Sequence, residues 1–478
     1  MNRGHEIPAA LHAAFKGAAD NSNQPVWLTA RRTASFDAFA AMGLPNTRHE
    51  EWKYTSLRPL LTHDWVMNNG ALQLPALAQA HLAAIKAADP QAILLSTFNG
   101  KSVPHEETGL ATQKMDGCSI QTFAQDISGD PETSRVQKFE RRLEAFEHLV
   151  PEFGSLHVRE QSWGRSSEML RLHQALASDG WIIEATSEVT AKIHVVHFVD
   201  ADRASAAFPT TFLSALPGSQ VVLAESVESI ESIGAPSHGS KHSSEFLLCP
   251  RLEVIADDRS KVQLIQMWSD KSAASGSIIG STRLFIGASC HIEAVALTDG
   301  SGLKRLNCGA VMLGAHSDLQ MRGLSTAAGS ATVDHHTSVD HLAPDTACRH
   351  TFKGIAAGKA RVVFNGKIFV RKSAIRTSSH QQSKALLMSA EAETDCKPQL
   401  EIDTDDVQCS HGTSIGQLNP DELFYLRSRG IPESVARHML AEGFARDTFD
   451  GVLSSHEAST VMRDVVSLMA KSLARMGL

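Results

Sequence analysis

A cysteine and a histidine two residues apart, Cys409 and His411, are the side chains best suited to metal chemistry in this sequence. Residues i and i+2 of an extended strand project from the same face, so the thiol and the imidazole would lie side by side. Sulfur and imidazole nitrogen are ligands for iron–sulfur clusters and for zinc. Two ligands are too few to hold a cluster, so the pair predicts half of a site that another polypeptide completes. The alternative is a core cysteine beside a hydrogen-bonded histidine, since Val407 shares their face.

A second group of metal-ligand types lies in Asp334–His336, followed by Asp340 and His341. Zinc or iron would accept such side chains. The two histidines of Asp334–His336 are adjacent, however, so on a strand they point in opposite directions. We therefore predict a structural or interface role for this group.

Two other segments have simpler interpretations than catalysis. The stretch Gly354–Ala360 is similar to a phosphate loop, but it is one residue short and lacks the Ser or Thr that would bind Mg²⁺, so we exclude nucleotide hydrolysis by this chain. Carboxylates at Asp403, Asp405 and Asp406 could perform acid–base chemistry in a carbohydrate-cleaving β-helix, but we favour a solvated acidic turn as their explanation.

Composition narrows the class of protein further. The 478 residues can bury a large core in two or three domains, and 45 Lys and Arg against 53 Asp and Glu leave a net charge of −8. That balance argues against a nucleic-acid-binding surface. The seven cysteines are scattered and show no C-x-x-C spacing. This pattern fits neither a disulfide framework nor a metal site made of four thiolates. The N-terminus has no signal-peptide core, and no apolar run approaches the roughly 18–20 residues that span a bilayer. We expect a cytoplasmic protein without membrane segments.

The region 181–418 has the alternating hydrophobic pattern of β-strands and almost no helical periodicity. The pieces Arg259–Leu264, Ser289–Ala294 and His316–Met321 repeat a small residue followed by an alternating strand. Repeats of roughly 20–30 residues with a strand in each are typical of the stacked coils of a β-helix or solenoid. A pair of β-sandwiches is the alternative.

Helices are predicted on both sides of this region. Val136–Leu149 carries Phe139, Leu143 and Phe146 on one helical face, and Ser162–Ser178 forms another helix that a following Asp-Gly pair ends. The sequence therefore predicts a mixed, largely helical N-terminal region over residues 1–180.

The C-terminal residues 419–478 are predicted to form a small helical domain. Asn419 is a favourable N-cap for a helix over Pro420–Arg429, which Gly430 ends. A second helix is expected from Pro432 to Gly443, and a third begins near Ser454.

Several motifs together resemble a known family. From about residue 40 to the end, the motifs, their order and the secondary-structure patterns between them resemble those of the SufB/SufD family of the SUF iron–sulfur cluster assembly system, and within it those of the SufD subunits. The motifs are Leu44–Thr55, Val333–Thr337, Phe352–Ile355, Ala360–Lys367, Asp405–Gly412 and Leu423–Gly430.

The resemblance implies a right-handed parallel β-helix core between a helical N-terminal region and a helical C-terminal domain. It implies a non-catalytic scaffold that pairs with a SufB paralogue through the β-helix. The C-terminal domain would dock SufC, the ABC-type ATPase subunit. A nascent iron–sulfur cluster would form at the SufB–SufD junction, with the position of His411 as a ligand and Cys409 beside it.

Some properties stay open at this stage. SUF complexes have been associated with reduced flavin, but this sequence shows no flavin motif. Exposed β-helix edges also predict a homodimer when the partner is missing. Two alternatives are a SufB-like subunit carrying the main cluster ligands, and a β-helix enzyme acting on carbohydrate.

Overall fold

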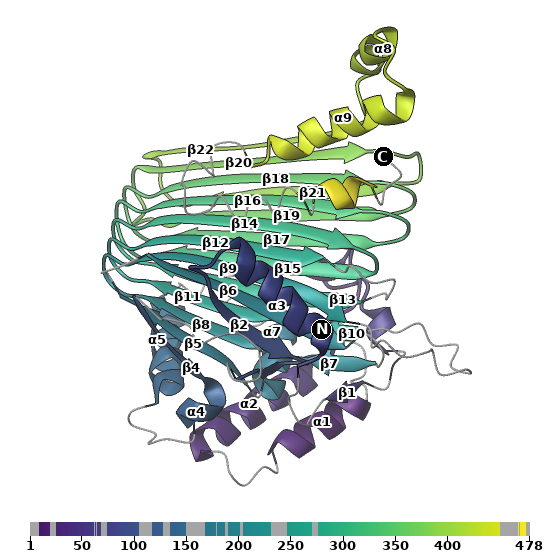
Figure 1. Ribbon diagram of the computed structural model, residues 1–478. Helices are drawn as coiled ribbons and strands as arrows, with labels where there is room; N and C mark the ends of the chain where they lie inside the picture. The colour runs from purple at the N-terminus through teal and green to yellow at the C-terminus, as the bar shows by residue number, and fades with distance from the viewer. Residues whose placement is uncertain are drawn as a thin grey trace, which may run out of the picture.

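The computed structural model describes residues 9–19, 25–61, 63, 65–67, 74–104, 117–127, 134–149, 168–177, 179–186, 190–200, 204–230, 246–269, 276–449, 467 and 469–474. Most of these residues form a parallel β-solenoid of about seven turns, with helices before and after it (Figure 1). The predicted β-helix core is thus confirmed. Paired β-sandwiches are excluded, because the neighbouring strands of each sheet, apart from one antiparallel edge strand in each, are parallel and belong to successive coils.

Each coil contributes one strand to each of two sheets that enclose the core. Sheet 1 runs in the order β4 (Cys118–Thr122), β5 (Gly180–Ala185), β8 (Thr210–Ala215), β11 (Arg251–Ala256), β13 (Ser277–Ile286), β15 (Leu303–Met312), β17 (Thr332–His341), β19 (Arg361–Val370) and β21 (Glu393–Ile402), with β1 (Val66–Met67), β7 (Ser205–Ala207) and β10 (Phe246–Leu248) beside it. Sheet 2 runs in the order β3 (Lys101–Ser102), β2 (Ile93–Phe98), β6 (Ala191–Asp200), β9 (Gln220–Ile230), β12 (Lys261–Ser269), β14 (His291–Gly300), β16 (Asp318–Ala327), β18 (Ala347–Ala356), β20 (Thr377–Leu387) and β22 (Val407–Gly416). Strands β2 and β4 come from the predicted N-terminal region, so that region adds strands to both sheets.

The turn that enters sheet 2 repeats its backbone geometry from coil to coil. Arg259, Ser289, His316, Asp345 and Arg376 all have positive φ, between 55° and 63°. Few non-glycine residues adopt this left-handed conformation, so its recurrence at equivalent positions marks the structural repeat. The first three residues begin the three repeated pieces seen in the sequence. That repeat therefore has the period of one coil.

The helices lie outside the solenoid and cover parts of it (Figure 1). They are α1 (Ala9–Ala19), α2 (Val26–Met42), α3 (Ala76–Ala88), α4 (Phe123–Ile127), α5 (Arg135–Leu149), α7 (Glu168–Leu176), α8 (Pro420–Ser428) and α9 (Glu433–Arg446), with short 3₁₀ helices η1 (Glu50–Trp52) and η2 (Arg58–Leu61). The predicted helix Val136–Leu149 is α5, and α7 is the described part of the predicted helix over 162–178. None of the helices in these described ranges combines the length and apolarity needed to span a bilayer.

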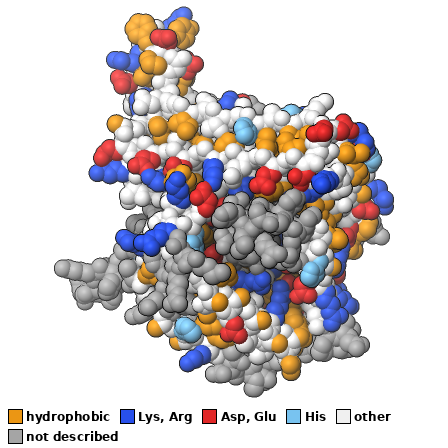
Figure 2. Space-filling model, turned by 180° about the vertical axis from the view of Figure 1, so that it is seen from behind, with side chains coloured by type: hydrophobic (Ala, Val, Ile, Leu, Met, Phe, Trp, Pro, Cys, Tyr) orange, Lys and Arg blue, Asp and Glu red, His pale blue; other side chains and the backbone are white. Residues whose placement is uncertain are grey.

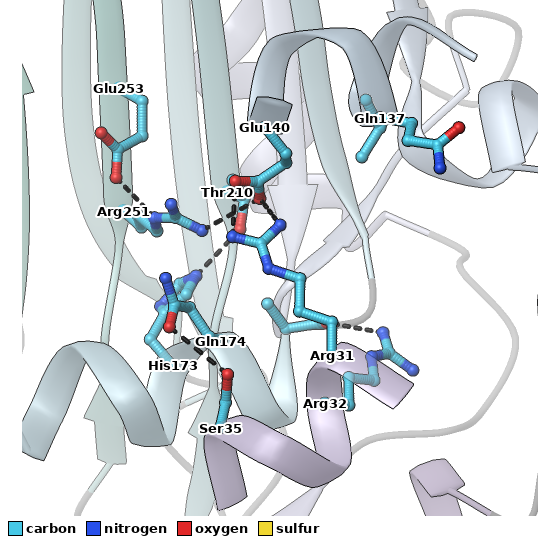
Figure 3. A network of polar contacts seen from close by, with 12 residues as sticks. Arg31, Arg32, Ser35, Gln137, Glu140, His173, Gln174, Thr210, Arg251 and Glu253 are labelled. Carbon is cyan, nitrogen blue, oxygen red and sulfur yellow. Dashed lines mark hydrogen bonds and ion pairs between the residues drawn. The ribbon is translucent and has the colours of Figure 1, made fainter. Parts of the chain in front are cut away.

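A buried ionic network fixes the N-terminal helices to sheet 1 (Figure 3). Arg31 Nη2 of α2 donates to Glu140 Oε2 of α5 at 2.5 Å. Arg251 of β11 approaches Glu140 Oε1 to 3.5 Å and donates to Glu253 Oε1 at 2.6 Å. Burial alone would raise the pKa of Glu140, but the charges of Arg31 and Arg251 lower it. A buried carboxylate held by two guanidinium groups therefore joins α2, α5 and the solenoid.

The first C-terminal helix matches its prediction closely. Asn419 caps α8 by accepting a hydrogen bond from the Asp421 backbone N–H at 2.9 Å. Gly430 has φ +85°, the left-handed conformation expected at a helix stop.

The predicted end of the second helix at Gly443 is wrong, because α9 continues to Arg446. Its Ala441 and Ala445 are buried in an apolar cluster on the outer face of sheet 2, together with Phe449. This packing outweighs the roughly 1 kcal/mol that a glycine costs inside a helix. The predicted start of the third helix near Ser454 lies outside the described residues. Residues 469–474 are helical, and Met469 and Leu473 are buried in the same cluster.

Candidate functional site

The last described coil, β21 and β22, leaves the solenoid open at its C-terminal end. Among the described strands, β21 is hydrogen-bonded only to β19, and β22 only to β20. Their interior positions are less covered than those of earlier coils, and Ile402 and Ile415 are exposed. Within the described part of the chain, both strands thus have an unpaired edge whose backbone groups can pair with another chain.

Cys409 and His411 both lie on the inner face of β22. Their register partners on β20 are Ser379 and Gln381, which are buried inside the solenoid. Ser410, between the two, points outward, where its hydroxyl lies 2.8 Å from Nδ1 of His380 on β20. The thiol and the imidazole therefore share one face, at the open end of the interior.

The surroundings of the two side chains differ. Cys409 is half-buried and packs with Val407, Leu400 and Ile368, whereas His411 is exposed. Burial raises the pKa of the Cys409 thiol, and a hydrogen bond with the Ser379 backbone offsets part of this effect. A metal that binds this sulfur must therefore displace a proton.

The chain offers no complete metal site in its described part. No group of three or more His, Cys, Asp or Glu side chains among the described residues is arranged to hold a metal ion. All seven cysteines are free thiols. Cys409 and His411 thus form a pair of ligand-type side chains on the last described coil, without a third such group to complete a metal site in the described part of the chain.

Polar side chains lie inside the solenoid both in its early coils and at this end. In the early coils, Gln266 donates to Glu225 at 2.6 Å among hydrocarbon side chains such as Leu223 and Leu264. In the later coils, His350, Gln381 and Ser383 occupy inward positions, and the Ser383 hydroxyl donates to the Cys396 thiol at 3.4 Å. The sequence motifs did not identify Ser379, Gln381 and Cys396 as neighbours of the candidate site. The repeat of the coils is the sequence signal that could have done so, since it aligns Gln381 with His411.

The histidines of β17 separate as predicted. His335 points inward and hydrogen-bonds with Thr298 and Ser325, and burial lowers its pKa to about 4. His336 points outward, 3.1 Å from Asp334 and 3.4 Å from Glu51. The two imidazoles serve different networks.

The two other segments considered above also take simple structures. The end of β18 and a turn into β19 form the glycine-containing segment Gly354–Ala360, with no helix after it. Asp403, Asp405 and Asp406 lie exposed in the turn between β21 and β22.

The end of the motif Leu44–Thr55, which contains Trp52, crosses the outer face of sheet 1. We call residues Glu50–Thr55 the strap. The Arg305 guanidinium of β15 stacks over the Trp52 ring at 3.7 Å. Thr55 donates to Asp334 of β17, which also accepts from Arg305 at 2.8 Å. These contacts bind the strap to the middle of the sheet.

The acidic end of the strap reaches the last coils. Glu51 accepts from Lys367 of β19 at 2.6 Å, and Glu50 pairs with Lys397 of β21. Burial would raise the pKa of Glu51, but the hydrogen bond with His336 and the charge of Lys367 lower it to about 2. The strap thus ties four successive strands of sheet 1 together, up to the open coil.

The C-terminal helices present an apolar surface away from the solenoid. α8 buries none of its side chains, and Phe424 and Tyr425 are 72% and 57% exposed. Val435 and Met439 of α9 are also exposed. Figures 1 and 2 show α8 projecting from the body of the protein, with hydrophobic side chains gathered on the projection. Such a patch marks an interaction site.

A solenoid with an open last coil, a thiol–imidazole pair on its inner face and a projecting helix with exposed aromatic side chains are features suited to a component of a larger assembly. The chain belongs to the SufBD family of the SUF iron–sulfur cluster assembly system. The family model for the SUF system FeS cluster assembly SufBD core domain matches residues 197–444, and the model for the SufBD protein N-terminal region matches residues 10–133. The family match begins before residue 40, where the sequence motifs start.

Named relatives agree with this assignment. An iron–sulfur cluster assembly SufBD family protein of Synechocystis sp. is 23% identical over 450 residues, covering 94% of this chain and 92% of the relative. The iron–sulfur cluster assembly protein SufD of Escherichia coli is 25% identical over 406 residues, covering 85% and 84%. The SufD protein of Bacillus subtilis is 33% identical over 116 residues, covering 24% and 26%. The family assignment replaces the carbohydrate-cleaving alternative.

Proposed function

We propose that this chain is a SufD-type scaffold subunit that supplies Cys409 and His411 to a nascent iron–sulfur cluster shared with a SufB-like paralogue. The observation that carries the proposal is the incomplete ligand pair on the inner face of the last coil. A scaffold must release its cluster, so exchangeable ligands divided between two chains suit the task better than a closed four-ligand site. The cluster is cargo here, and the chain itself catalyses no reaction.

The free edges of β21 and β22 support pairing with the paralogue. Parallel strands of a second solenoid can continue both sheets there, and main-chain hydrogen bonds would provide the affinity. Such a junction would cover Cys409 and His411 and bring the partner's ligands to them. The same edges allow a homodimer when the paralogue is absent.

The projecting helices support docking of a SufC-like ABC ATPase. Phe424 and Tyr425 are exposed on a helix that fully buries none of its side chains, and a partner surface would explain their exposure. ATP hydrolysis would then occur in the partner, and α8 and α9 would transmit its conformational change to sheet 2, on which α9 packs. We accordingly propose three parts: an N-terminal region over residues 1–180, a β-helix core over residues 181–418 and a docking domain over residues 419–478. Free thiols throughout the chain support a reducing cytoplasm as its location.

The test is reconstitution of a complex in which only one imidazole is removed. The chain is co-expressed with its SufB-like and SufC-like partners, and iron and sulfide are supplied anaerobically to the purified complex. His411→Ala should leave the complex assembled but lower its cluster content, measured by iron, sulfide and the visible absorption spectrum. The matched control is His380→Ala, since His380 is also exposed but lies on the outer face of the neighbouring strand.

Equal cluster content in wild type and His411→Ala would contradict the ligand role. Failure of the chain to co-purify with either partner would contradict the scaffold role. A SufB-like identity would instead predict that this chain alone supplies most of the cluster ligands.

A further inference from the structure

A column of four side chains runs through the interior and ends at the candidate ligand. Met321, His350, Gln381 and His411 occupy the same ladder position in the successive sheet 2 strands β16, β18, β20 and β22. Register partners in neighbouring strands lie about 4.8 Å apart, so each side chain of the column can contact the next. The first three are buried, and His411 lies at the open end.

The chemistry of the buried members gives their hydrogen bonds a direction. Nε2 of His350 lies 2.9 Å from Sδ of Met321. A thioether can only accept, so His350 must donate from Nε2. Burial lowers the pKa of His350 to about 3, so the ring is neutral and its Nδ1 is an acceptor. The Gln381 amide Nε2, 3.3 Å away, donates to that nitrogen.

This assignment leaves the Gln381 carbonyl as an acceptor without a donor. The Gln381 side chain is 3% exposed, and its buried Oε1 has no hydrogen-bond partner among the described residues. An unsatisfied buried acceptor costs about 1–3 kcal/mol. Since Nε2 of the flat amide is directed to His350 in the coil below, Oε1 is turned to another side.

A glycine in the opposite sheet also limits where the Gln381 amide can lie. Gly366 of β19 faces Gln381 across the interior, and a Cβ at Gly366 would lie 1.9 Å from Gln381 Nε2. Any larger residue there would displace the amide. The glycine and the His350 hydrogen bond together hold the amide in one place.

We propose that Gln381 is a positioning residue for His411: when the exposed His411 ring turns toward the interior, its N–H donates to the unpaired Gln381 Oε1, which fixes the tautomer and ring orientation of the candidate ligand. The ring nitrogen that does not donate then keeps its lone pair for iron. Metal-bound histidines commonly donate their second nitrogen to such an acceptor. This inference rests on the proposed function, because it assigns His411 a ligand whose geometry needs control.

The direct test reads the tautomer without any cluster. Long-range ¹H–¹⁵N correlation spectra of the full chain with ¹⁵N-labelled histidine would be recorded, and the His411 signals identified by their loss in His411→Ala. In wild type, one ring nitrogen should be protonated and the other not. In Gln381→Leu, which removes the acceptor, the two signals should move toward their average as the tautomers exchange.

Two further variants keep the test decisive if Gln381→Leu does not fold. Gln381→Glu keeps an acceptor oxygen and should retain a single tautomer. Gly366→Ala leaves Gln381 unchanged but displaces its amide, and it should mix the tautomers. The matched control is Gln382→Leu, since Gln382 is the same residue type next in the strand but exposed on the outer face. Averaged signals in wild type, or an unchanged single tautomer in both Gln381→Leu and Gly366→Ala, would overturn the proposal.

The outcomes also separate this inference from the function on which it rests. If His411→Ala lowers cluster content but the tautomer is independent of Gln381, the positioning role fails and the scaffold function stands. If Gln381 sets the tautomer but His411→Ala leaves cluster content unchanged, the ligand role of His411 fails. If both hold, Gln381→Leu should weaken iron retention in the complex by about 10–100-fold, the usual effect of removing a partner of a metal ligand.

Discussion

Replacing Glu51 by glutamine tests whether the strap is held to the solenoid by charge. The Glu51 carboxylate is 25% exposed and contacts Lys367 and His336, from two different strands of sheet 1. Glutamine keeps the shape of the side chain but removes its charge. We expect the strap to open more often in Glu51→Gln while the solenoid remains folded, because solenoid coils unfold locally rather than all at once.

The magnitude follows from the pKa of Glu51. Lowering it from 4.5 in the unfolded chain to about 2 in the folded chain corresponds to about 3 kcal/mol of stabilisation. Because the folded pKa is the lower one, this contribution is complete above pH 4.5 and is lost as the pH falls toward 2. Wild type and Glu51→Gln should thus differ most at neutral pH, and the difference should fall by about half near pH 3.

Hydrogen exchange measured by mass spectrometry gives the opening free energy of the strap directly. At pH 7, amide protection in the peptide containing Glu50–Thr55 should fall by up to about 100-fold in Glu51→Gln, the factor equivalent to roughly 3 kcal/mol. Glu50→Gln is the matched control: its pair with Lys397 is largely exposed, and exposed pairs contribute about 0–1 kcal/mol. Equal effects of the two variants, or a difference that persists undiminished at pH 3, would refute the electrostatic account.

Two predictions concern the C-terminal helices. Replacing Phe424 and Tyr425 together by serine should abolish binding of the SufC-like ATPase while leaving the circular dichroism spectrum unchanged, because both side chains are more than half exposed; retained binding in a pull-down assay would place the docking surface elsewhere. Asn419→Ala removes the cap of α8 and should lower the local stability of that helix by about 1 kcal/mol, seen as faster amide exchange in Pro420–Ser428; unchanged exchange would mean that the cap contributes nothing.

Local sequence signals predicted the elements that depend on local physics. Asn419 before Pro420 marks a helix start because an N-cap needs only a short side chain and its own backbone, and the structure has that hydrogen bond. The stop at Gly443 failed because α9 packs on sheet 2, and burial of Ala441 and Ala445 is invisible to a local rule. The same limit applies to the strands β2 and β4, whose partners β6 and β5 come about 60 or more residues later in the chain.

For the site, the sequence determined which residue types lie on one strand face, since the alternation of a strand is a property of the backbone. Cys409 and His411 were therefore identifiable as a pair, and the motifs around them pointed to the SufBD family. Two features of the site depend on how the coils stack and cannot be predicted from the spacing of residues within one strand. The pair faces an open interior, and Gln381 and His350 lie beneath His411. Contacts between residues 30 or more positions apart depend on the register between coils. That register is set by the packing of the whole solenoid rather than by any local segment.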